Sequence, residues 1–383
     1  MSEQFLDGVE VINIDNGSRP VQTIRSFVLG LIGTAPNADV TQFPSNTPVL
    51  VFSRTEAAGL GADGTLLDTI ERKFDEYDTA VIIVRVDEGA DDAETLTNVI
   101  GGVESDGSRT GLQAFLDAKS VLGYQPRILV APEFSHQAAC MTELAALATR
   151  LRAVAIIDGP NTTDADAIAQ AGTSGSQRLF MVDPWVKVFK NSAETIEPAS
   201  ARVAGMLAWS DHNRGFWWSP SNLEMFGIIG TARPVDFSLG DVNARANLLN
   251  EKNITTIIQE SGYRLWGNRT LSSDPKWSFI NVMRTADMIN DSILRSHLWA
   301  VDRNITKTYL QDLKESVNNY LRQLTSIGAI LGGSCWLDPE LNTPDQIAAG
   351  RVYVNFDFTP PAPAERITFR SEVVNDYIQE IIA

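Results

Sequence analysis

Histidine, cysteine and basic residues are all scarce in this chain of 383 residues. Its three histidines and two cysteines stand singly, without the short CxxC or HxxxH spacings that gather ligands around a metal ion, which argues against a closed zinc site. Cys140 and Cys335 lie far apart in the sequence, among apolar or small residues. We therefore expect two buried free thiols, which suits a reducing compartment.

The charge balance and the lack of long apolar runs restrict the partners of the chain. With 31 basic against 48 acidic residues the net charge is −17, which argues against nucleic acid, because phosphate binding needs a local surplus of Lys and Arg. No apolar run approaches the roughly 20 residues of a membrane span. The opening residues, MSEQFLDGVEV, also lack the basic and apolar regions of a secretory signal. We expect neither a nucleic-acid partner nor membrane insertion.

Much of the chain has a repeated βα pattern. Short buried-type strands alternate with amphipathic helices, and such units require a mostly parallel sheet with helices on its faces. The expected strands lie at 23–33, 49–53, 80–86, 127–131, 153–157 and 178–182, and the expected helices at 65–77, 111–119, 136–151, 164–171 and 198–209. The sequence thus predicts an α/β fold with a central, mostly parallel sheet domain flanked by helices.

A different pattern begins near residue 246. Two long amphipathic helices are expected at 277–299 and 306–324, with strands at 254–259, 329–337 and 351–358, which predicts an α+β C-terminal domain. The prolines that follow form a stiff spacer. The predicted division is 1–20 for an N-terminal arm, 21–95 for an N-terminal α/β segment, 96–245 for the central domain, 246–360 for the C-terminal domain and 361–383 for an extended C-terminal arm.

Both arms carry short strand-like alternation without an obvious local partner. The apolar positions are Val9, Val11, Ile12 and Ile14 in the first arm and Ile367, Phe369 and Val373 in the second.

The stretch Gly262 to Trp277, GYRLWGNRTLSSDPKW, joins the two patterns. It combines rigid apolar side chains such as Trp266 with Arg264, Asn268 and Arg269, whose donors need partners when they are packed. Two interpretations stay open: a wedged loop between two cores, or a contact platform for another chain.

Three basic residues, Lys307, Lys314 and Arg322, lie beside the apolar stripe of the second long helix. They form either an ordinary solvated rim or, in a chain of net charge −17, a docking strip for an acidic partner.

Two features point to enzyme chemistry. Gly59 to Gly64 matches the dinucleotide fingerprint GxGxxG, which is the basis of an alternative assignment as a nucleotide-dependent α/β enzyme. However, five residues separate the strand from its first glycine, whereas the fingerprint needs a tight turn at the strand end. Ser135, His136 and Asp158 lie near strand ends, but no GxSxG elbow accompanies them, and Asp158 is better explained as a group that turns or caps the chain.

The blocks RLWGNRTLSSDPKW and HLWAVDRNIT resemble the tail sheath proteins of contractile phages, and are most similar to the sheaths of R-type pyocins (tailocins) and related phage tails. Further matching blocks are GLQAFLDAKS, QPRILVAPE, LRAVAIIDGPN, QRLFMVDP, FWWSPSN, RANLLN and GRVYVNFDFTPPAPAE. The resemblance implies a structural subunit, not an enzyme, that needs no cofactor. It implies stacked hexameric rings around an inner tube, whose contraction drives the tube through a cell envelope.

The resemblance also implies the partners and the location. These are further copies of the chain, the tail tube protein, and baseplate and tail terminator proteins, in a virion or tailocin particle assembled in the bacterial host cytoplasm. The family's central domain is described as subtilisin-like in fold, but this chain shows no convincing Asp, His and Ser set.

In the family, the two arms add strands to a sheet in the C-terminal domains of neighbouring subunits, which satisfies unpaired backbone groups. The expected acceptor sheet here contains Ile254, Ile257, Leu265, Val352 and Val354. The C-terminal domain also meets the tube, so Lys307, Lys314 and Arg322 become candidate tube contacts. Arg264, Trp266, Asn268 and Arg269 are then interpreted as a hinge between these two surfaces.

Overall fold

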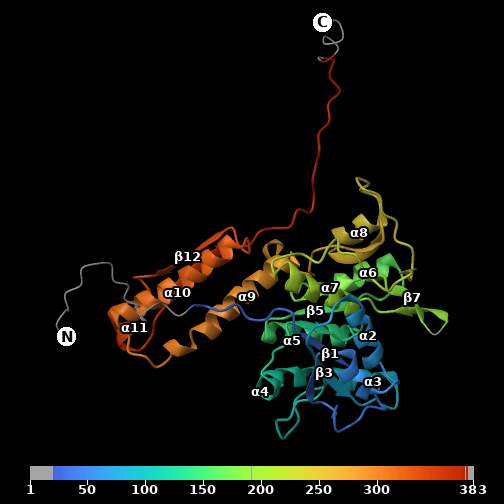
Figure 1. Cartoon of the computed structure of the whole chain (residues 1–383), viewed down its shortest axis with the longest axis horizontal. Helices are drawn as coiled ribbons and strands as arrows, with labels where there is room; N and C mark the ends of the chain where they lie inside the picture. Colours follow the sequence, from blue (N-terminus) through green and yellow to red (C-terminus); the bar gives the residue numbers. More distant parts are fainter. Residues whose placement is uncertain (1–19, 191, 376, 378–383) are drawn as a thin grey trace, which may run out of the picture.

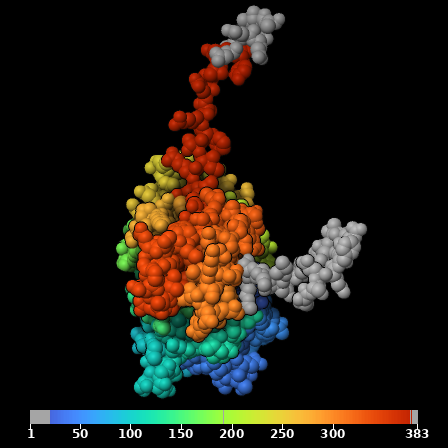
Figure 2. Space-filling model, turned by 90° about the vertical axis from the view of Figure 1, so that its left-hand side faces the viewer, coloured from blue at the N-terminus to red at the C-terminus, as the bar shows by residue number. Residues whose placement is uncertain are grey.

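The computed structural model describes residues 20–190, 192–375 and 377. Figure 1 shows an α/β body and, beside it, a helical unit in which α9 (Ile280–Ser296), α10 (Lys307–Ser326) and strand β12 (Gly332–Leu337) pack together. A C-terminal tail extends away from both parts, as Figure 2 also shows.

An eight-stranded sheet forms the centre of the body, in the order β11-β10-β6-β5-β4-β1-β3-β2. The six inner strands run parallel, whereas β2 and β11 lie antiparallel to their neighbours at the two edges. The strands are β1 Leu29–Thr34, β2 Pro48–Val51, β3 Val81–Val86, β4 Ile128–Val130, β5 Val154–Asp158, β6 Leu179–Val182, β10 Ile254–Gln259 and β11 Tyr263–Trp266. The predicted α/β fold with a mostly parallel sheet is confirmed.

Side chains of the inner strands alternate between two cores, as the two-residue period of a strand requires. In β3, Val81 and Ile83 belong to one core and Ile82 and Val84 to the other, and all four are 0% exposed. Helices α2 (Leu66–Glu76) and α7 (Ser200–Asn213) cover the first core, and α3 (Asp92–Ile100) and α5 (Ala138–Leu151) cover the second. The remaining helices of the body are α1 Arg54–Ala57, α4 Ala118–Leu122, α6 Asp164–Ala171 and α8 Arg245–Glu251, with 3-10 turns η1 Ala58–Leu60, η2 Gly111–Leu116 and η3 Pro275–Trp277.

The C-terminal unit has its own small core. Its buried side chains include Tyr320 and Leu321 of α10 and Met288 and Ile289 of α9. The chain passes from α9 through η4 (Leu298–Ala300) to α10, where Thr306 caps the helix by accepting a hydrogen bond from Tyr309 N at 3.2 Å. After β12 come α11 (Pro344–Ala348) and β13 (Val354–Thr359), which pairs with β12.

Several elements depart from the sequence predictions. A three-stranded sheet of β7 (Val186–Lys190), β8 (Ala193–Glu197) and β9 (Gly230–Thr231), and helix α3, are found where no element was expected. The predicted boundaries after residues 95 and 245 fall within α3 and at the first residue of α8, and the large sheet takes strands from both sides of each. The expected buried free thiols are confirmed at Cys140 and Cys335.

Candidate assembly surfaces

The C-terminal unit carries a two-stranded sheet, β12–β13, whose outer edges have no strand partner among the described residues. The strands are antiparallel, and one face packs on α10 through Cys335 and through Phe356 and Phe358, whose rings stack with centroids 6.2 Å apart. Unpaired strand edges present free N–H and C=O groups. The β12–β13 sheet can therefore accept a further strand at its edges.

A tail leaves the body after β13. Residues 360–375 form no helix or strand, and Figure 2 shows them projecting from the molecule. Beyond the base of this tail the apolar side chains lie in solvent: Ile367 is 70% exposed, Phe369 91% and Val373 98%. Large apolar side chains exposed to this extent in one segment indicate a surface that another chain covers.

The base of the tail is fixed to the body. Arg269 donates from Nε and Nη2 to the two carboxylate oxygens of Glu365, both at 2.6 Å, and its guanidinium lies 5.1 Å from the centre of the Phe279 ring. Asn281 Nδ2 donates to Pro361 O at 3.2 Å. These contacts set the direction in which the tail leaves.

The prediction of one acceptor sheet is wrong, because its residues are divided between two sheets. Ile254 and Ile257 lie in β10 and Leu265 in β11, both in the large sheet, whereas Val354 begins β13 and Val352 lies just before it. Strand β10 has no free edge because β6 and β11 flank it. The outer edge of β11 is also paired, since Leu265 N donates to Leu223 O at 3.0 Å. Only the β13 part of the predicted acceptor retains an open edge among the described strands.

The four predicted junction residues lie around β11 and the base of the tail. Arg264 donates to the carbonyl oxygens of Glu260 and Asn222, each at 3.0 Å, and Asn268 is 8% exposed. The Trp266 ring packs edge-on against a phenylalanine ring. Arg269 forms the ion pair with Glu365 at the base of the tail. Their role as a hinge stays a prediction.

The basic strip lies on the outer side of α10. Lys307 and Arg322 are exposed and Lys314 is half-buried, while the apolar stripe of the helix packs inward. Arg322 lies 3.7 Å from Glu315, on the same helix. Nothing in the geometry of the described residues fixes what this strip contacts, so its role stays a prediction.

A group of ion pairs between the body and α9 was not predicted from the sequence. Arg127, Arg152 and Arg178 lie just before β4, β5 and β6, and the amino ends of these parallel strands share one sheet edge. From that edge Arg178 donates to both oxygens of Asp287, with the Nη2 to Oδ1 distance 3.0 Å, and Arg127 and Arg152 both pair with Asp291. The sequence pattern that could have indicated these ion pairs is an arginine before each of three buried strands, together with two aspartates at helical spacing.

The Ser135, His136 and Asp158 group does not form a nucleophile and base. Asp158 is fully buried and accepts from Ser135 Oγ at 3.0 Å, Ser200 Oγ at 2.5 Å and Ser200 N at 2.9 Å. Burial raises the pKa of this carboxyl to about 6. Its bonds tie β5 to the first residue of α7, which is the structural role expected for it. His136 instead packs against the Trp185 ring at 5.8 Å.

The Gly59 to Gly64 loop is filled by the chain itself. A Cβ atom at Gly64, where φ is +89°, would lie 2.4 Å from Thr34 O, and one at Gly61 would lie 2.8 Å from Asn37 O. The strand before the loop, β2, is an antiparallel edge strand, so the βαβ context of a dinucleotide site is missing. The glycines here allow close backbone packing. In the described part of the chain no group of three or more His, Cys, Asp or Glu could hold a metal ion, and no described helix is long and apolar enough to cross a membrane.

An open two-stranded sheet and an exposed apolar tail in one chain are typical of subunits that join one another by strand addition. Comparison with known proteins identifies the family to which the chain belongs. Residues 107–271 match the model of the phage tail sheath protein central domain, and residues 272–374 match that of the phage tail sheath C-terminal domain. The chain belongs to the phage tail sheath protein family.

Two relatives match this chain over almost their whole length. A major tail sheath protein of a Pseudomonas aeruginosa (strain UCBPP-PA14) prophage is 46% identical over 382 residues, covering 99% of each chain. The tail sheath protein of Escherichia phage P2 is 33% identical over 387 residues, covering 98% of this chain and 97% of the relative.

Two solved structures share the fold. The helical sheath of the anti-feeding prophage in its contracted state matches with a TM-score of 0.74 at 21% identity, over 96% of this chain and 99% of that one. The sheath of the PVC extracellular contractile injection system, also contracted, matches with a TM-score of 0.72 at 18% identity, over 99% of this chain and 100% of that one.

Proposed function

We propose that this chain is the structural subunit of a contractile tail sheath, which assembles as hexameric rings stacked around an inner tube. Shortening of the sheath drives the tube through a cell envelope. One observation carries the proposal: the same chain has a two-stranded sheet, β12–β13, with open edges among the described strands, and a tail whose Phe369 and Val373 are 91% and 98% exposed.

The tail of one copy adds as a strand to β12–β13 of the next. The Arg269–Glu365 ion pair directs the tail outward from its own subunit, so Ile367, Phe369 and Val373 are presented to a neighbour. Main-chain hydrogen bonds to the open edge provide affinity, and the alternating side chains provide register.

The N-terminal arm forms a second link of the same kind. Its apolar positions, Val9, Val11, Ile12 and Ile14, lie outside the described residues. The described chain begins at Pro20, and residues 20–28 run along α9, where Gln22 N and Ile24 N donate to Ser296 Oγ and Ser292 Oγ at 3.1 and 3.2 Å. Two strands donated to two different neighbours create a mesh that stays connected while subunits move.

Contraction in this proposal needs no cofactor and no enzymatic step. The extended sheath is assembled in a metastable state, and the free energy of new contacts between subunits drives its rearrangement. The alternative, a nucleotide-dependent enzyme, is not favoured, because Gly61 and Gly64 of its loop are packed against backbone atoms of residues 37 and 34.

The inner surface of the sheath contacts the tube protein through α10. Lys307, Lys314 and Arg322 provide weak, salt-sensitive contacts there. At its ends the sheath meets baseplate and tail terminator proteins, within a virion or tailocin particle assembled in the bacterial host cytoplasm.

Negative-stain microscopy of the purified chain tests the proposal. A sheath subunit should form tubes or rings, and discrete particles under all assembly conditions would contradict it.

Removal of residues 1–19 should abolish polymers and leave a folded monomer by circular dichroism, whereas unchanged polymers would overturn the role of the N-terminal arm. Lys307→Glu with Lys314→Glu should weaken co-assembly with the tube protein and its salt dependence. If neither changes, α10 faces elsewhere.

A further inference from the structure

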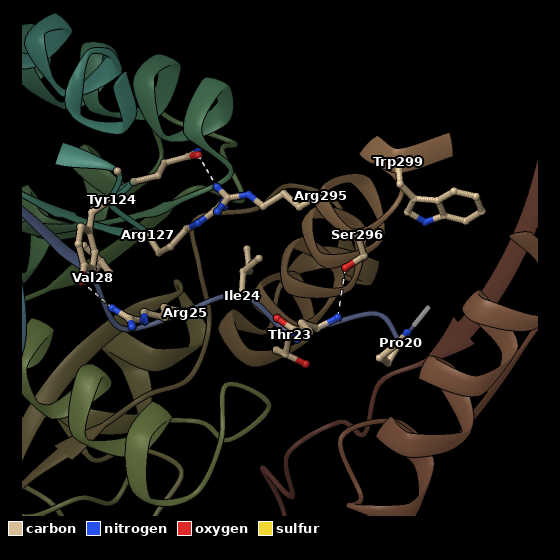
Figure 3. Close-up of a pocket in the computed structure, with 13 residues that line it drawn as sticks. Pro20, Thr23, Ile24, Arg25, Val28, Tyr124, Arg127, Arg295, Ser296 and Trp299 are labelled. Carbon is tan, nitrogen blue, oxygen red and sulfur yellow. Dashed lines mark hydrogen bonds between the residues drawn. The ribbon is translucent and has the colours of Figure 1, made fainter. Parts of the chain in front are cut away.

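A groove of about 760 Å³ lies where residues 20–28, α9 and the segment before β4 meet. Figure 3 shows Arg25, Arg127 and Tyr124 toward one end of it and Trp299 and Pro20 toward the other. Of the described residues that line this groove, three are arginines, the third being Arg295, and none is acidic. In a chain of net charge −17 such a lining is unusual, and it selects an anionic ligand.

Two of these arginines retain donors for a ligand. Arg25 and Arg295 are both exposed. Arg25 Nη1 donates to Tyr124 Oη at 2.8 Å, and Arg295 Nη2 donates to Gln125 Oε1 at 2.7 Å. A guanidinium has five N–H groups in a fixed plane, so each side chain is oriented by one neutral partner and still presents donors to a carboxylate.

An acidic loop lies at the opposite edge of the same sheet. The groove is at the amino ends of β1 and β4, since Val28 and Arg127 line it and directly precede these strands. Residues 87–94, DEGADDAE, directly follow β3, which runs parallel to β1, so this loop lies at the carboxyl edge. It holds five carboxylates and no basic residue.

The loop is ordered before it meets a partner. Asp91 Oδ1 accepts from Glu94 N at 2.8 Å at the start of α3, and Glu94 Oε2 accepts from Ala90 N at 2.7 Å. Glu88 and Asp92 are exposed and take part in neither bond. A preordered acidic projection loses little conformational entropy when it binds.

We propose that the arginine groove of one copy receives the acidic loop 87–94 of a neighbouring copy. The two surfaces lie at opposite edges of one subunit, so the contact is head-to-tail, and head-to-tail contacts repeat into rings or helical filaments. The inference rests on the proposed polymerisation and adds to it a charged contact of defined residues, separate from strand addition.

A charge-swap experiment on full-length protein tests this contact. The groove variant is Arg25→Glu with Arg295→Glu, and the loop variant is Glu88→Lys with Asp92→Lys. Arg127, Asp87 and Asp91 are left intact because they hold Asp291, Arg85 and α3 within the subunit. The control variant, Lys119→Glu with Lys252→Glu, makes the same charge change as the groove variant at exposed sites outside the groove.

The measurement is the critical concentration for polymerisation, by sedimentation. Each single-sided variant should raise it about tenfold or more, and a chain that carries both sets should recover to within about threefold of wild type, because opposite charges again face each other. The control should stay near wild type. The proposal would be overturned if the groove variant raised the critical concentration and the loop variant did not, or if the combined variant polymerised no better than either single-sided variant. Either result would point to another anionic occupant of the groove. If the wild type itself does not polymerise, the proposed function fails, which is a different outcome.

Discussion

Arg284 of α9 and Asp211 of α7 form a bidentate ion pair, with Nη1 to Oδ1 and Nη2 to Oδ2 distances of 2.6 and 2.5 Å. The side chains are 3% and 0% exposed. With the Arg178–Asp287 pair and the Asp291 group, this contact joins α9 to the body through charge. Ile280 and Met283 of the same helix add apolar packing in the first core. The C-terminal unit is thereby held in one orientation relative to the sheet.

Replacing one partner of this pair should lower the free energy of unfolding by more than replacing both partners. Asp211→Ala leaves Arg284 buried without its counter-ion and should lower the free energy of unfolding by about 3–5 kcal/mol, whereas replacing both residues, with Arg284→Met and Asp211→Leu, should cost clearly less. Urea unfolding of the unassembled subunit measures both. Equal losses for the single and double variants would show that the pair itself is strongly favourable.

The sequence allowed the sheet to be predicted because its strands are short, apolar and fully buried, as in the segment from Ile128 to Val130. The bounds of strand β10 were predicted correctly, but the strands with which it pairs were not. Whether it joins β6 or β13 depends on tertiary pairing that strand propensity does not encode. The β7–β8 hairpin was missed because its outer face, at Phe189 and Ile196, is apolar and exposed and so breaks the usual alternation.

Some residues of the candidate assembly surfaces stood out in the sequence, and others did not. Ile367, Phe369 and Val373 stood out because apolar alternation followed a proline spacer that ends the body. The arginines before β4, β5 and β6 were not recognised, because their partners on α9 are more than 100 residues away, as for Arg178 and Asp287. Contacts at such separation are not visible in local sequence.

Substitutions at glycine test whether the Gly59 to Gly64 loop serves close backbone packing. Gly64→Ala should destabilise the subunit by more than Gly107→Ala, although φ is +89° at one and +87° at the other. At Gly107 nothing lies within 4 Å of the added Cβ, so only backbone strain of about 1–2 kcal/mol is expected. At Gly64 the Cβ would also meet Thr34 O at 2.4 Å. Equal losses in thermal unfolding would contradict the observed packing.

Glu76 should make stability depend on pH. Burial raises the pKa of this carboxyl from 4.5 to about 8, and Oε1 accepts from Phe226 N at 2.9 Å. Between these two values the unfolded chain is ionised while the folded chain keeps the proton, so the free energy of unfolding falls as pH rises and levels off above about 8.

Glu76→Gln keeps an acceptor for Phe226 N and cannot ionise. Its advantage over wild type in melting temperature should therefore grow as pH rises from 4.5 to about 8. Parallel melting curves for the two proteins across this window would show that Glu76 is ionised in the folded state.

The tail should matter for assembly and not for folding. Phe369→Asp with Val373→Asp should raise the critical concentration for polymerisation by at least about tenfold, since each charge would enter a strand pairing that buries an apolar group. Melting of the unassembled subunit should not change, because these side chains are 91% and 98% exposed. Val103→Asp with Val121→Asp, at sites 63% and 61% exposed outside the tail, is the matched control and should assemble normally.

In the proposed sheath, the β12–β13 sheet is completed by a strand from a neighbouring copy. Cryo-electron microscopy of polymers formed by the wild-type chain tests it most directly, at a resolution that assigns side chains. We expect an added strand that contains Ile367, Phe369 and Val373 of one copy, hydrogen-bonded along an edge of β12–β13 in another. A two-stranded β12–β13 sheet in the polymer, with residues 365–374 paired to nothing, would contradict it.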